Sequence, residues 1–520
     1  MPKVERTSTV PASTCFVYLT PVTTMSQLHR RTFIKTSAMA VAAAGLSARL
    51  HAQAAGANGD LRVAVVGFRS RGQEHIKELK RIKGVRIVAL CDVDSRVVAK
   101  GLKDNPGAKG YTDMRKMLED KEIDAVSIAS PNHLHSIQGI WTLQAGKHLY
   151  VEKPLSHNIF EGQQLVAASQ HFSKLIVQAG TQSRSGAGIR SAIKAVHAGE
   201  YGKVKVARAI CYKRRKSIGP AKKNALPAEI DNDLWHGPAD LQESIRGNES
   251  DKVTEAANNG PVHYDWHWFW NYGGGDITNQ GIHQMDVARW FLGETGLPAS
   301  VMSLGGRFGY RDDAETPNTL LSVFNFEKAP LIFEVRGLPM KAGMKAMDNY
   351  RGTRVGVVVQ CENGYVTVSE SGTANIYDNA NTKIKALSNG GNGSHRANFV
   401  KAVKNRKVAV GLIEECHYST ALCHLGNLSY LVGADKSNAA IGEAIKASAP
   451  TTEAYGRILE HLKANTVDVA TTPTVLGPLL TLDRKTEMFT GADKVVVDAA
   501  NNHALRKRVG RGAFTIPQLA

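Results

Sequence analysis

Two side chains that can exchange protons stand in distinctive surroundings in this sequence. Lys153 lies in the tripeptide Glu152-Lys153-Pro154, directly after a short apolar run. His283 lies in the stretch GGGDITNQGIHQMD, residues 273–286, behind three consecutive glycines. A neutral imidazole can act as a general base, and a lysine buried beside another cation has a lowered pKa and can donate to a hydroxyl. We therefore expect a substrate hydroxyl to lie between the two. Either residue could accept its proton; His283 is the preferred base, and Lys153 would stabilise the developing alkoxide.

The residues around His283 sharpen this expectation. The pattern GIHQMDVARWFLG predicts an amphipathic helix that begins near Gly281, so the helix dipole would keep His283 neutral. Asn279 stands four residues earlier, where its amide oxygen could accept a hydrogen bond from the imidazole without adding a charge. The alternative is a helix-capping histidine without chemistry, and for Lys153 a surface lysine before a turn-forming proline.

A glycine pattern near the start of the chain favours a dinucleotide-binding turn. The apolar run Leu61–Val66 predicts a buried strand, and Gly67 and Gly72 follow it at the first and third positions of the fingerprint G-x-G-x-x-G. Arg69 occupies the middle position, where glycine is usual. Asp92 lies 25 residues after Gly67, at the end of a second apolar run, where an acid binds the ribose hydroxyls.

The Asp92 carboxylate would repel a 2′-phosphate, so we expect NAD as the cofactor. The nearby cations Arg69, Arg71 and Arg96 could offset this repulsion and keep NADP as the alternative.

The elements that must position these groups follow an alternating pattern. Further apolar runs at Ile123–Pro131, before Glu152 and before Gly180 alternate with amphipathic segments such as His135–Ala145 and Phe160–His171. This order predicts a doubly wound parallel sheet, whose ligands bind at the carboxyl ends of the strands. An α/β domain without a nucleotide is the alternative. The expected cofactor contacts are Gly67, Phe68, Arg69, Ser70, Arg71, Gly72, Asp92, Arg96, Ser130, Asn132, His135, Glu152, Lys153 and Gln182.

Residues 1–54 predict an export signal. Arg30-Arg31 precede Phe33, a short apolar run and the small residues AQAA. This is the order of a twin-arginine leader, and its apolar run is too short to span a membrane comfortably. Residues 1–24 suggest a start site placed too early, with Met25 as the first residue. Because this route carries folded proteins, we expect a periplasmic or exported protein that already holds its cofactor. A chance Arg pair before a buried helix is the alternative.

Composition bears on the number of domains and on whether the protein binds nucleic acid or metal or forms disulfides. The chain has 520 residues, 42% hydrophobic and 22% charged, as in a globular protein of two or three domains. Its net charge of +18 accompanies no nucleic-acid motif, so we expect no nucleic-acid partner. Five scattered cysteines after the leader argue against a disulfide framework. The pairs Cys416-His417 and Cys423-His424 favour a packed helix face over a metal site, and we expect no metal.

Five stretches together resemble the glucose–fructose oxidoreductase / inositol dehydrogenase (Gfo/Idh/MocA) family, in its exported, twin-arginine-bearing branch. They are VAVVGFRSRG, LCDVD, SPNHLHS, VEKPLS and GGGDITNQGIHQMDVARW. The resemblance implies an N-terminal Rossmann domain and a C-terminal α/β domain with a large, open, mixed and mostly antiparallel sheet. It also implies a sugar or polyol substrate, and a homo-oligomer formed through that sheet. Lys153 and His283 match the family's lysine and catalytic histidine, whereas Asn279 stands where many members have aspartate.

The second half of the chain supplies the substrate candidates. Nine Lys or Arg and no acid fall between Lys203 and Lys223, which indicates either a wall facing an acidic sugar or a solvated strand edge. The aromatic run VHYDWHWFWNY could stack on a sugar or belong to the core. The residues expected at the substrate are Arg184, Arg214, Trp266, His267 and Asp286, and the glycines 273–275 are expected to bring the chain close to cofactor and substrate.

These observations give one leading hypothesis and two alternatives. Residues 60–180 would form the NAD(P)-binding domain and residues 181–520 the substrate and oligomerisation domain. The leading function is an exported oxidoreductase that transfers hydride between a tightly bound nicotinamide cofactor and a sugar or polyol. The alternatives are a glycosidase or lyase that oxidises its sugar transiently, and a non-catalytic sugar-binding protein.

Overall fold

The computed structural model describes residues 59–220, 223–243, 245–246, 262–388, 390 and 394–519. The leader expected at residues 1–54 lies outside these residues. Within them, none of the helices has the length and hydropathy needed to cross a membrane. The cysteines Cys91, Cys211, Cys361, Cys416 and Cys423 are all buried and free.

The N-terminal part is a doubly wound parallel sheet, as the sequence predicts. Its six strands follow the order β3-β2-β1-β4-β5-β6, and each neighbouring pair is parallel. The strands are β1 (Leu61–Val66), β2 (Val85–Cys91), β3 (Lys109–Tyr111), β4 (Ala125–Ile128), β5 (His148–Val151) and β6 (Val177–Ala179). The helices between them are α2 (Arg71–Lys80), α3 (Ser95–Asp104), α4 (Met114–Leu118), α5 (His135–Gln144) and α6 (Ile159–His171), with a short turn η1 (Asn132–Leu134).

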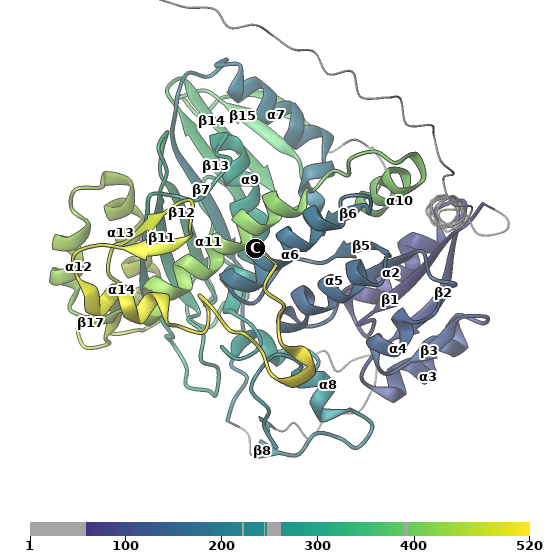
Figure 1. Ribbon diagram of the computed structural model, residues 1–520. Coiled ribbons are helices and arrows are strands. Elements are labelled where there is room, and N and C mark those ends of the chain that lie inside the picture. The colour runs from purple at the N-terminus through teal and green to yellow at the C-terminus, as the bar shows by residue number, and fades with distance from the viewer. Residues whose placement is uncertain are drawn as a thin grey trace, which may run out of the picture. The chain divides into compact units, whose positions relative to one another are not determined.

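A helix from far along the chain completes this layer. Helix α10 (His395–Asn405) places Phe399, Val400 and Val403 in the same buried cluster as strand β1. Figure 1 shows α10 beside β6, away from its neighbours in sequence. The nucleotide-binding part therefore includes residues well beyond the expected boundary at residue 180.

The second sheet is large, mixed and mostly antiparallel, as the family resemblance implies. Its order is β16-β15-β14-β13-β7-β12-β11-β10-β18-β17, with β19 on β10 and β20 on β19. Only β7 and β12 run parallel; the other pairs are antiparallel. The strands are β7 (Val204–Tyr212), β10 (Ser300–Gly306), β11 (Thr319–Asn325), β12 (Leu331–Arg336), β13 (Val355–Cys361), β14 (Gly364–Ser369), β15 (Ala374–Tyr377), β16 (Lys383–Leu387), β17 (Ala434–Lys436), β18 (Thr474–Leu476), β19 (Leu480–Asp483) and β20 (Met488–Thr490).

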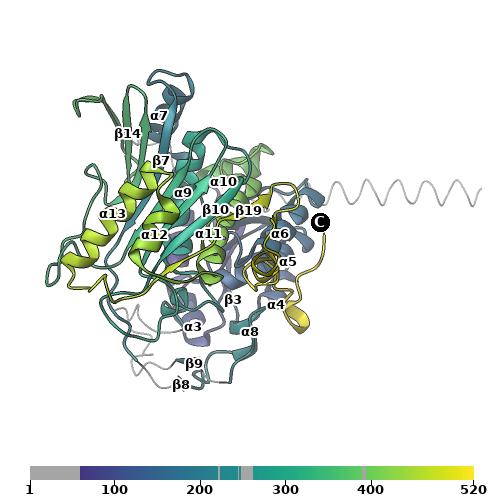
Figure 2. The ribbon, with the colours of Figure 1, turned by 90° about the vertical axis from the view of Figure 1, so that its left-hand side faces the viewer.

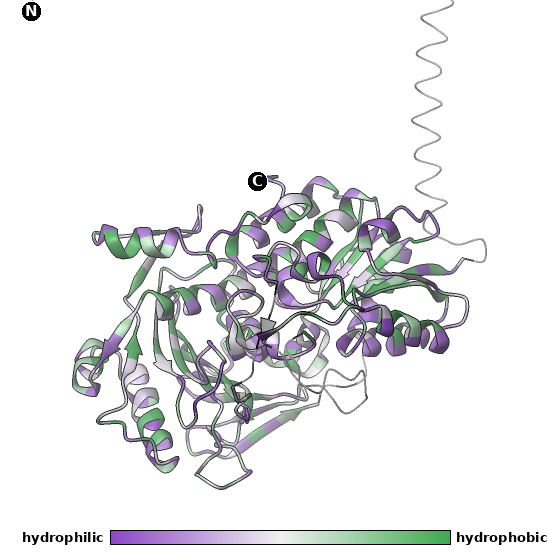
Figure 3. Cartoon of the chain, turned by 90° about the horizontal axis from the view of Figure 1, so that it is seen from below, coloured by the Kyte–Doolittle hydropathy of each residue, from purple (hydrophilic) through white to green (hydrophobic). Residues whose placement is uncertain are grey.

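Helices cover both faces of this sheet. Helices α7 (Ala187–His197), α9 (Ile282–Leu292) and α11 (Ile413–Leu431) pack on the face that carries the largest apolar cluster. Helices α12 (Asn438–Ile445) and α13 (Ala449–Ala464) cover the other face over β7, β10, β11 and β12 (Figure 2). Figure 3 shows helices with both hydrophobic and hydrophilic residues, as expected for elements with one buried side.

Short elements complete the part of the chain that is described. They are η2 (Gln182–Ser185), β8 (Lys223–Asn224), α8 (Asn232–His236), β9 (Ile245–Arg246), η3 (Asp265–Trp268), the π-helical turn η4 (Ile277–Gly281), α14 (Lys494–Asn501) and η5 (Gly512–Phe514).

Candidate active site

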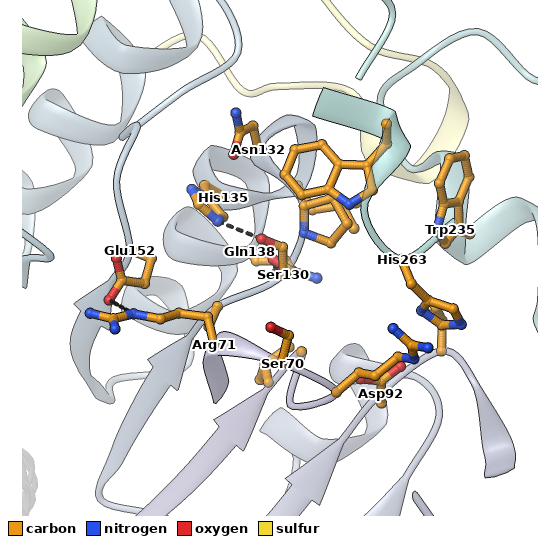
Figure 4. Close-up of a pocket in the computed structure, with 18 of the residues that line it drawn as sticks. Ser70, Arg71, Asp92, Ser130, Asn132, His135, Gln138, Glu152, Trp235 and His263 are labelled. Atoms are coloured by element: carbon orange, nitrogen blue, oxygen red, sulfur yellow. Dashed lines mark hydrogen bonds and ion pairs between the residues drawn. The ribbon is translucent and has the colours of Figure 1, made fainter. Parts of the chain in front are cut away.

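A cavity of about 370 Å³ lies at the carboxyl ends of the parallel strands. This is where a doubly wound sheet binds its ligands. Figure 4 shows Arg71 and Glu152 side by side in one part of the pocket and Asp92 beneath His263 in another. The expected site residues that line it are Gly67, Arg69, Ser70, Arg71, Asp92, Ser130, Asn132, His135, Glu152, Lys153, Trp266, His267, Asn279 and His283.

The turn after β1 requires two glycines. Gly67 has a φ of +72°, and a Cβ at this position would lie 2.5 Å from the main-chain nitrogen of Ser130. A Cβ at Gly72 would lie 2.3 Å from the carbonyl oxygen of Gly67. The loss of the middle glycine to Arg69 therefore leaves the tight turn and the close approach of the helix intact.

The Asp92 carboxylate is held in place by main-chain donors. The N–H of Phe68 donates to Asp92 Oδ2 at 3.0 Å, and the N–H of Asp94 donates to Oδ1 at 3.1 Å. Burial raises the pKa of Asp92 from its usual value, against the effect of these two hydrogen bonds. The two hydrogen bonds thus fix the carboxylate at the end of β2, where ribose hydroxyls bind in dinucleotide domains. The cradle at Gly67 and the acid at Asp92 both fit a dinucleotide.

Glu152 is the centre of a buried polar network. Its Oε1 accepts from Gln182 Nε2 at 2.8 Å, Arg71 Nε at 3.1 Å and Arg396 Nη2 at 3.3 Å, and contacts His75 Nε2 at 3.0 Å. Glu152 itself is buried, and its hydrogen bond with His75 and the charges of the arginines hold its pKa well below the usual range despite that burial. Glu152 is therefore ionised and held in a fixed position next to Lys153.

Lys153 reaches across to the second half of the chain. Its Nζ donates to the main-chain carbonyl of Asn279 at 2.7 Å. Burial lowers the pKa of Lys153 to about 8, although the Glu152 carboxylate acts in the opposite direction. An amine with such a pKa carries and loses a proton near neutrality, which suits acid–base work.

The π-helical turn η4 changes the expected position of His283. Helical structure begins at Gly275 and continues through η4 into α9, so His283 does not stand at a helix N-terminus as we expected. Burial, followed by the charge of Lys153, lowers the pKa of His283 to about 3. The imidazole is neutral at pH 7, but the helix dipole is not the reason. Among the residues that the structure describes, none forms a hydrogen bond with this imidazole, and Asn279 is not its partner.

The first of the glycines 273–275 packs against the aromatic segment η3. A Cβ at Gly273 would lie 2.6 Å from the Cα of His267 and 2.7 Å from the carbonyl oxygen of Trp266. Gly273 therefore brings the chain close to η3, and none of the three glycines lines the cavity, in contrast to the expected approach to the ligand. The rings of Trp266 and His267 stack at a centroid distance of 3.6 Å and line the cavity.

Several expected site residues lie outside the cavity lining. Phe68 is buried in the core, Arg96 pairs with Asp94 at 2.8 Å, and Arg214 is exposed. Gly72 packs in the turn and Gln182 holds Glu152. Gly72 and Gln182 contact residues that form the site, but none of these five lines the cavity.

Arg184 and Asp286 form a buried ion pair with each other and do not line the cavity. Arg184 Nη2 donates to Asp286 Oδ1 at 2.8 Å, and Asp286 is 1% exposed. Ser419 Oγ also donates to this carboxylate at 2.7 Å. A buried, paired carboxylate cannot meet a sugar hydroxyl, so the expectation of substrate binding by this pair is corrected.

The neighbours of Arg214 also lie outside the cavity lining, but they contact the turn η4 and the residue before it. Lys213 Nζ donates to Gln280 Oε1 at 3.1 Å, and Arg215 Nε donates to Asp276 Oδ2 at 2.9 Å. Because side chains alternate along an extended segment, positions 213 and 215 share a side that position 214 does not. This alternation is the signal that could have found them.

Other residues that line the cavity were not among the predicted site residues. They include Trp235 of α8, His263 and Tyr264 before η3, Trp141 of α5, and Phe514 of the C-terminal tail. His263 and Tyr264 belong to the aromatic run noted in the sequence. Trp235, Trp141 and Phe514 carry no local signal, because they reach the cavity only through long-range packing.

Comparisons with known proteins agree with this arrangement. Residues 61–180 match the model of an oxidoreductase family described as an NAD-binding Rossmann fold, and residues 252–337 match the GFO/IDH/MocA C-terminal domain. The inositol 2-dehydrogenase of Salmonella paratyphi B is 31% identical over 144 residues, which cover 27% of this chain and 43% of that protein. A glycosyl hydrolase family 109 protein of Shewanella putrefaciens is 30% identical over 177 residues, 29% of this chain and 39% of that protein.

The chain therefore matches less than half of the length of either curated relative. Among solved structures, the WlbA dehydrogenase from Bordetella pertussis in complex with NADH and UDP-GlcNAcA shares 18% identity, with a TM-score of 0.51 over 70% of this chain and 94% of that one. This likeness supports the fold.

Proposed function

The chain belongs to the Gfo/Idh/MocA family of oxidoreductases, and on that premise we propose that it transfers hydride between NAD and a sugar or polyol. The observation that carries the proposal is the meeting of Lys153, His283 and His267 in the cavity that begins at the Gly67 turn. Asp92 favours NAD over NADP, because a carboxylate at this position repels a 2′-phosphate.

Lys153 and His283 have different roles in the proposed reaction. NAD, when bound, supplies the acceptor for the hydride that leaves the substrate carbon. Lys153, with a pKa of about 8, accepts the hydroxyl proton in its neutral form. His283, with a pKa of about 3, is too weak a base for this step and instead binds the same hydroxyl as a neutral imidazole. This assignment replaces our expectation that His283 takes the proton.

The charge of the site bears on the substrate. Lys213 and Arg71 both lower the pKa of Lys153 through their positive charges, so several cations lie near the reacting groups. Cations in a partly buried site favour an anionic ligand. We therefore extend the proposal to acidic sugars as candidate substrates.

The test begins with the purified protein. Absorbance of bound reduced nicotinamide is recorded while sugars, polyols and sugar acids are added in turn. A sugar that builds or bleaches this band supports the proposal. A protein that binds neither NAD nor NADH would contradict it and would favour the non-catalytic sugar-binding alternative.

A glycosidase that oxidises its sugar transiently is the second candidate. One of the relatives bears the name glycosyl hydrolase family 109 protein, and such a reaction would use the same cofactor cavity and proton-transferring groups. Its signature is cleavage of a glycoside, with NAD bound and no net change in the reduced-nicotinamide band.

We also propose that the protein is exported by the twin-arginine route with its cofactor already bound. Arg30 and Arg31 and the apolar run after them support this, although they lie outside the described residues. Fractionation of cells that produce the full chain tests it: the processed protein should appear outside the cytoplasm, and Arg30→Lys with Arg31→Lys should retain it inside.

We propose a homo-oligomer formed through the large sheet, but helices already cover part of the sheet surface on which a second subunit could pack. Arg457 of α13 donates to Glu334 Oε2 of β12 at 3.0 Å, and Arg208 of β7 pairs with Glu453 of α13 at 2.8 Å. Helices α12 and α13 thus already occupy part of one face, and a second subunit would have to bind elsewhere on the sheet.

A further inference from the structure

The C-terminal tail, Leu505–Leu519, runs from the second half of the chain to the Rossmann sheet. It contains only one short helical turn, η5. Figure 1 shows this yellow segment beside α8 and ending near α6. A segment with so little secondary structure must be held by side chains and by contacts with other elements.

The tail begins by completing helix α6. The N–H groups of Ile159 and Phe160, the first two residues of α6, donate to the carbonyls of Leu505 at 3.2 Å and Arg506 at 3.1 Å. The first N–H groups of a helix have no partner within it, so this contact satisfies donors that would otherwise be buried and unpaired.

Two arginines anchor the middle of the tail. Arg508 Nη1 donates to the carbonyl of Asn271 at 2.9 Å, and its Nη2 lies 3.6 Å from the buried Glu161 carboxylate. Arg511 Nε donates to the carbonyl of Ala239 at 3.0 Å, and its Nη2 donates to the carbonyl of Asp233 at the same distance. The tail thus joins α6, α8 and the aromatic segment.

The end of the tail packs into the nucleotide-binding part. Phe514 is 2% exposed, its ring centroid lies 5.7 Å from that of Trp141, and the Arg115 guanidinium lies 5.3 Å from the ring. Ile516 joins the buried cluster that includes Met114 and Ile128. Phe514 also lines the cavity, together with Met114 and Trp141.

The neighbours of Phe514 show which part of the cavity this side chain lines. Lys153 and His283 mark the reacting end. Asp92 marks the ribose of the adenosine half, and Asp113 and Met114 follow β3, the next strand outward from β2. The apolar wall of Met114, Trp141 and Phe514 therefore faces the place that remains for a flat aromatic base.

We propose that the C-terminal tail is part of the cofactor site, with Phe514 forming a wall of the adenine pocket. The inference rests on the proposed function, because it takes the cavity to hold NAD. A bound dinucleotide then leaves slowly, since the docked tail covers its adenine end. This gives the retention of the cofactor a structural basis that is independent of the leader.

The release of NADH tests this proposal. The protein is loaded with NADH, an excess of ADP-ribose is added, and the decay of nicotinamide fluorescence gives the release rate. In Phe514→Ala the rate should rise about tenfold to a hundredfold, the size expected when an aromatic face beside a base is lost. The matched control is Leu519→Ala in the same tail, whose side chain is 41% exposed and lies outside the cavity lining.

The outcomes separate the two proposals. A wild-type chain that takes up no NADH contradicts the proposed function and, with it, this inference. A wild-type chain that holds NADH, with Phe514→Ala releasing it at the wild-type rate, overturns the inference alone. Phe514→Leu serves if the alanine variant does not fold: it keeps most of the volume, and a faster release in this variant supports the role of the aromatic ring, whereas an unchanged rate contradicts it.

Discussion

Lys153 Nζ donates a hydrogen bond to the main-chain carbonyl of Asn279 at 2.7 Å, which joins the end of strand β5 to the π-helical turn η4. A π-helical turn interrupts the regular hydrogen-bond ladder of a helix, and such turns are frequent at functional sites. In the same turn the carbonyl of Ile277 accepts from Cys423 Sγ at 3.2 Å. The backbone around position 279, more than its side chain, therefore sets the position of the lysine.

Lys153→Met should lower turnover about a hundredfold to ten-thousandfold, because the variant cannot accept the hydroxyl proton. NAD should still bind, since the Gly67 turn and Asp92 remain. Steady-state rates and NADH fluorescence check these two expectations. Lys100→Met is the matched control, because this lysine is exposed and lies outside the cavity lining. A Lys153→Met variant with near wild-type turnover would exclude the assignment.

The pH dependence of sugar oxidation should follow Lys153. Only the neutral amine accepts a proton, so the rate should rise with pH through a pKa of about 8 and level off above it. His283→Ala should lower the rate while leaving the position of this limb in place, because the imidazole is already neutral throughout this range. A limb near pH 6.5 that vanishes in His283→Ala would return the role of base to the histidine.

Asn279→Asp should move that limb to higher pH. The new carboxylate would lie beside Lys153 and His283, and a negative charge favours the protonated form of both. We expect a shift on the order of one pH unit, with lower turnover at pH 7 as a result. Asn279→Leu, of similar size and without charge, should leave the limb in place. An unshifted limb in Asn279→Asp would mean that this side chain is too far from both groups to influence them.

Glu152→Gln should reduce the free energy of unfolding by roughly 3–5 kcal/mol, because it leaves Arg71 and Arg396 beside a neutral amide in a buried site. The pKa of Glu152 is lowered in the folded state, so its contribution is present above the unfolded pKa of about 4.5 and is lost at lower pH. Urea unfolding at several pH values measures this. Glu122→Gln, whose partner Arg62 is retained by Asp124, should cost less than about 1 kcal/mol. Equal losses in the two variants would contradict the central role of Glu152.

Gly67→Ala should abolish NAD binding while the sheet still folds. Its Cβ would meet the main chain of Ser130, and its φ of +72° disfavours any side chain. Gly442→Ala is the control, because a Cβ there meets nothing within 4 Å and the residue lies in helix α12. NADH fluorescence reports binding, and circular dichroism reports folding. Normal NADH affinity in Gly67→Ala would place the nucleotide elsewhere.

The first layer of the fold was predictable because its signals are local. The run Leu61–Val66 is β1 in full, and the second apolar run, which ends at Asp92, contains β2. Such runs are buried on both sides in a parallel sheet and are visible without knowledge of the partner strand. Lys153 and His283 were found through their motifs, and Trp266 and His267 through their aromatic setting.

The rest depended on contacts between distant residues. Arg184 and Asp286 are 102 positions apart, and only the structure shows that they pair. Helix α9 begins at Ile282, close to the predicted start, but the π-helical turn joins it to earlier helical structure, which the amphipathic pattern alone could not show. Phe514 and Trp235 reach the cavity from segments without a motif, so their role depends on tertiary packing.

Helix α10 has a consequence for the order in which the protein can be completed during synthesis. Its Arg396 binds Glu152, and its Phe399 fills the core against strand β1, yet it is made long after the last strand of that sheet. At ribosomal rates the interval is on the order of tens of seconds. Through that time the half-built nucleotide domain exposes the surface that α10 will cover, and Glu152 lacks one of its cations. The polar network around Glu152 is therefore complete only after the second half of the chain has been made.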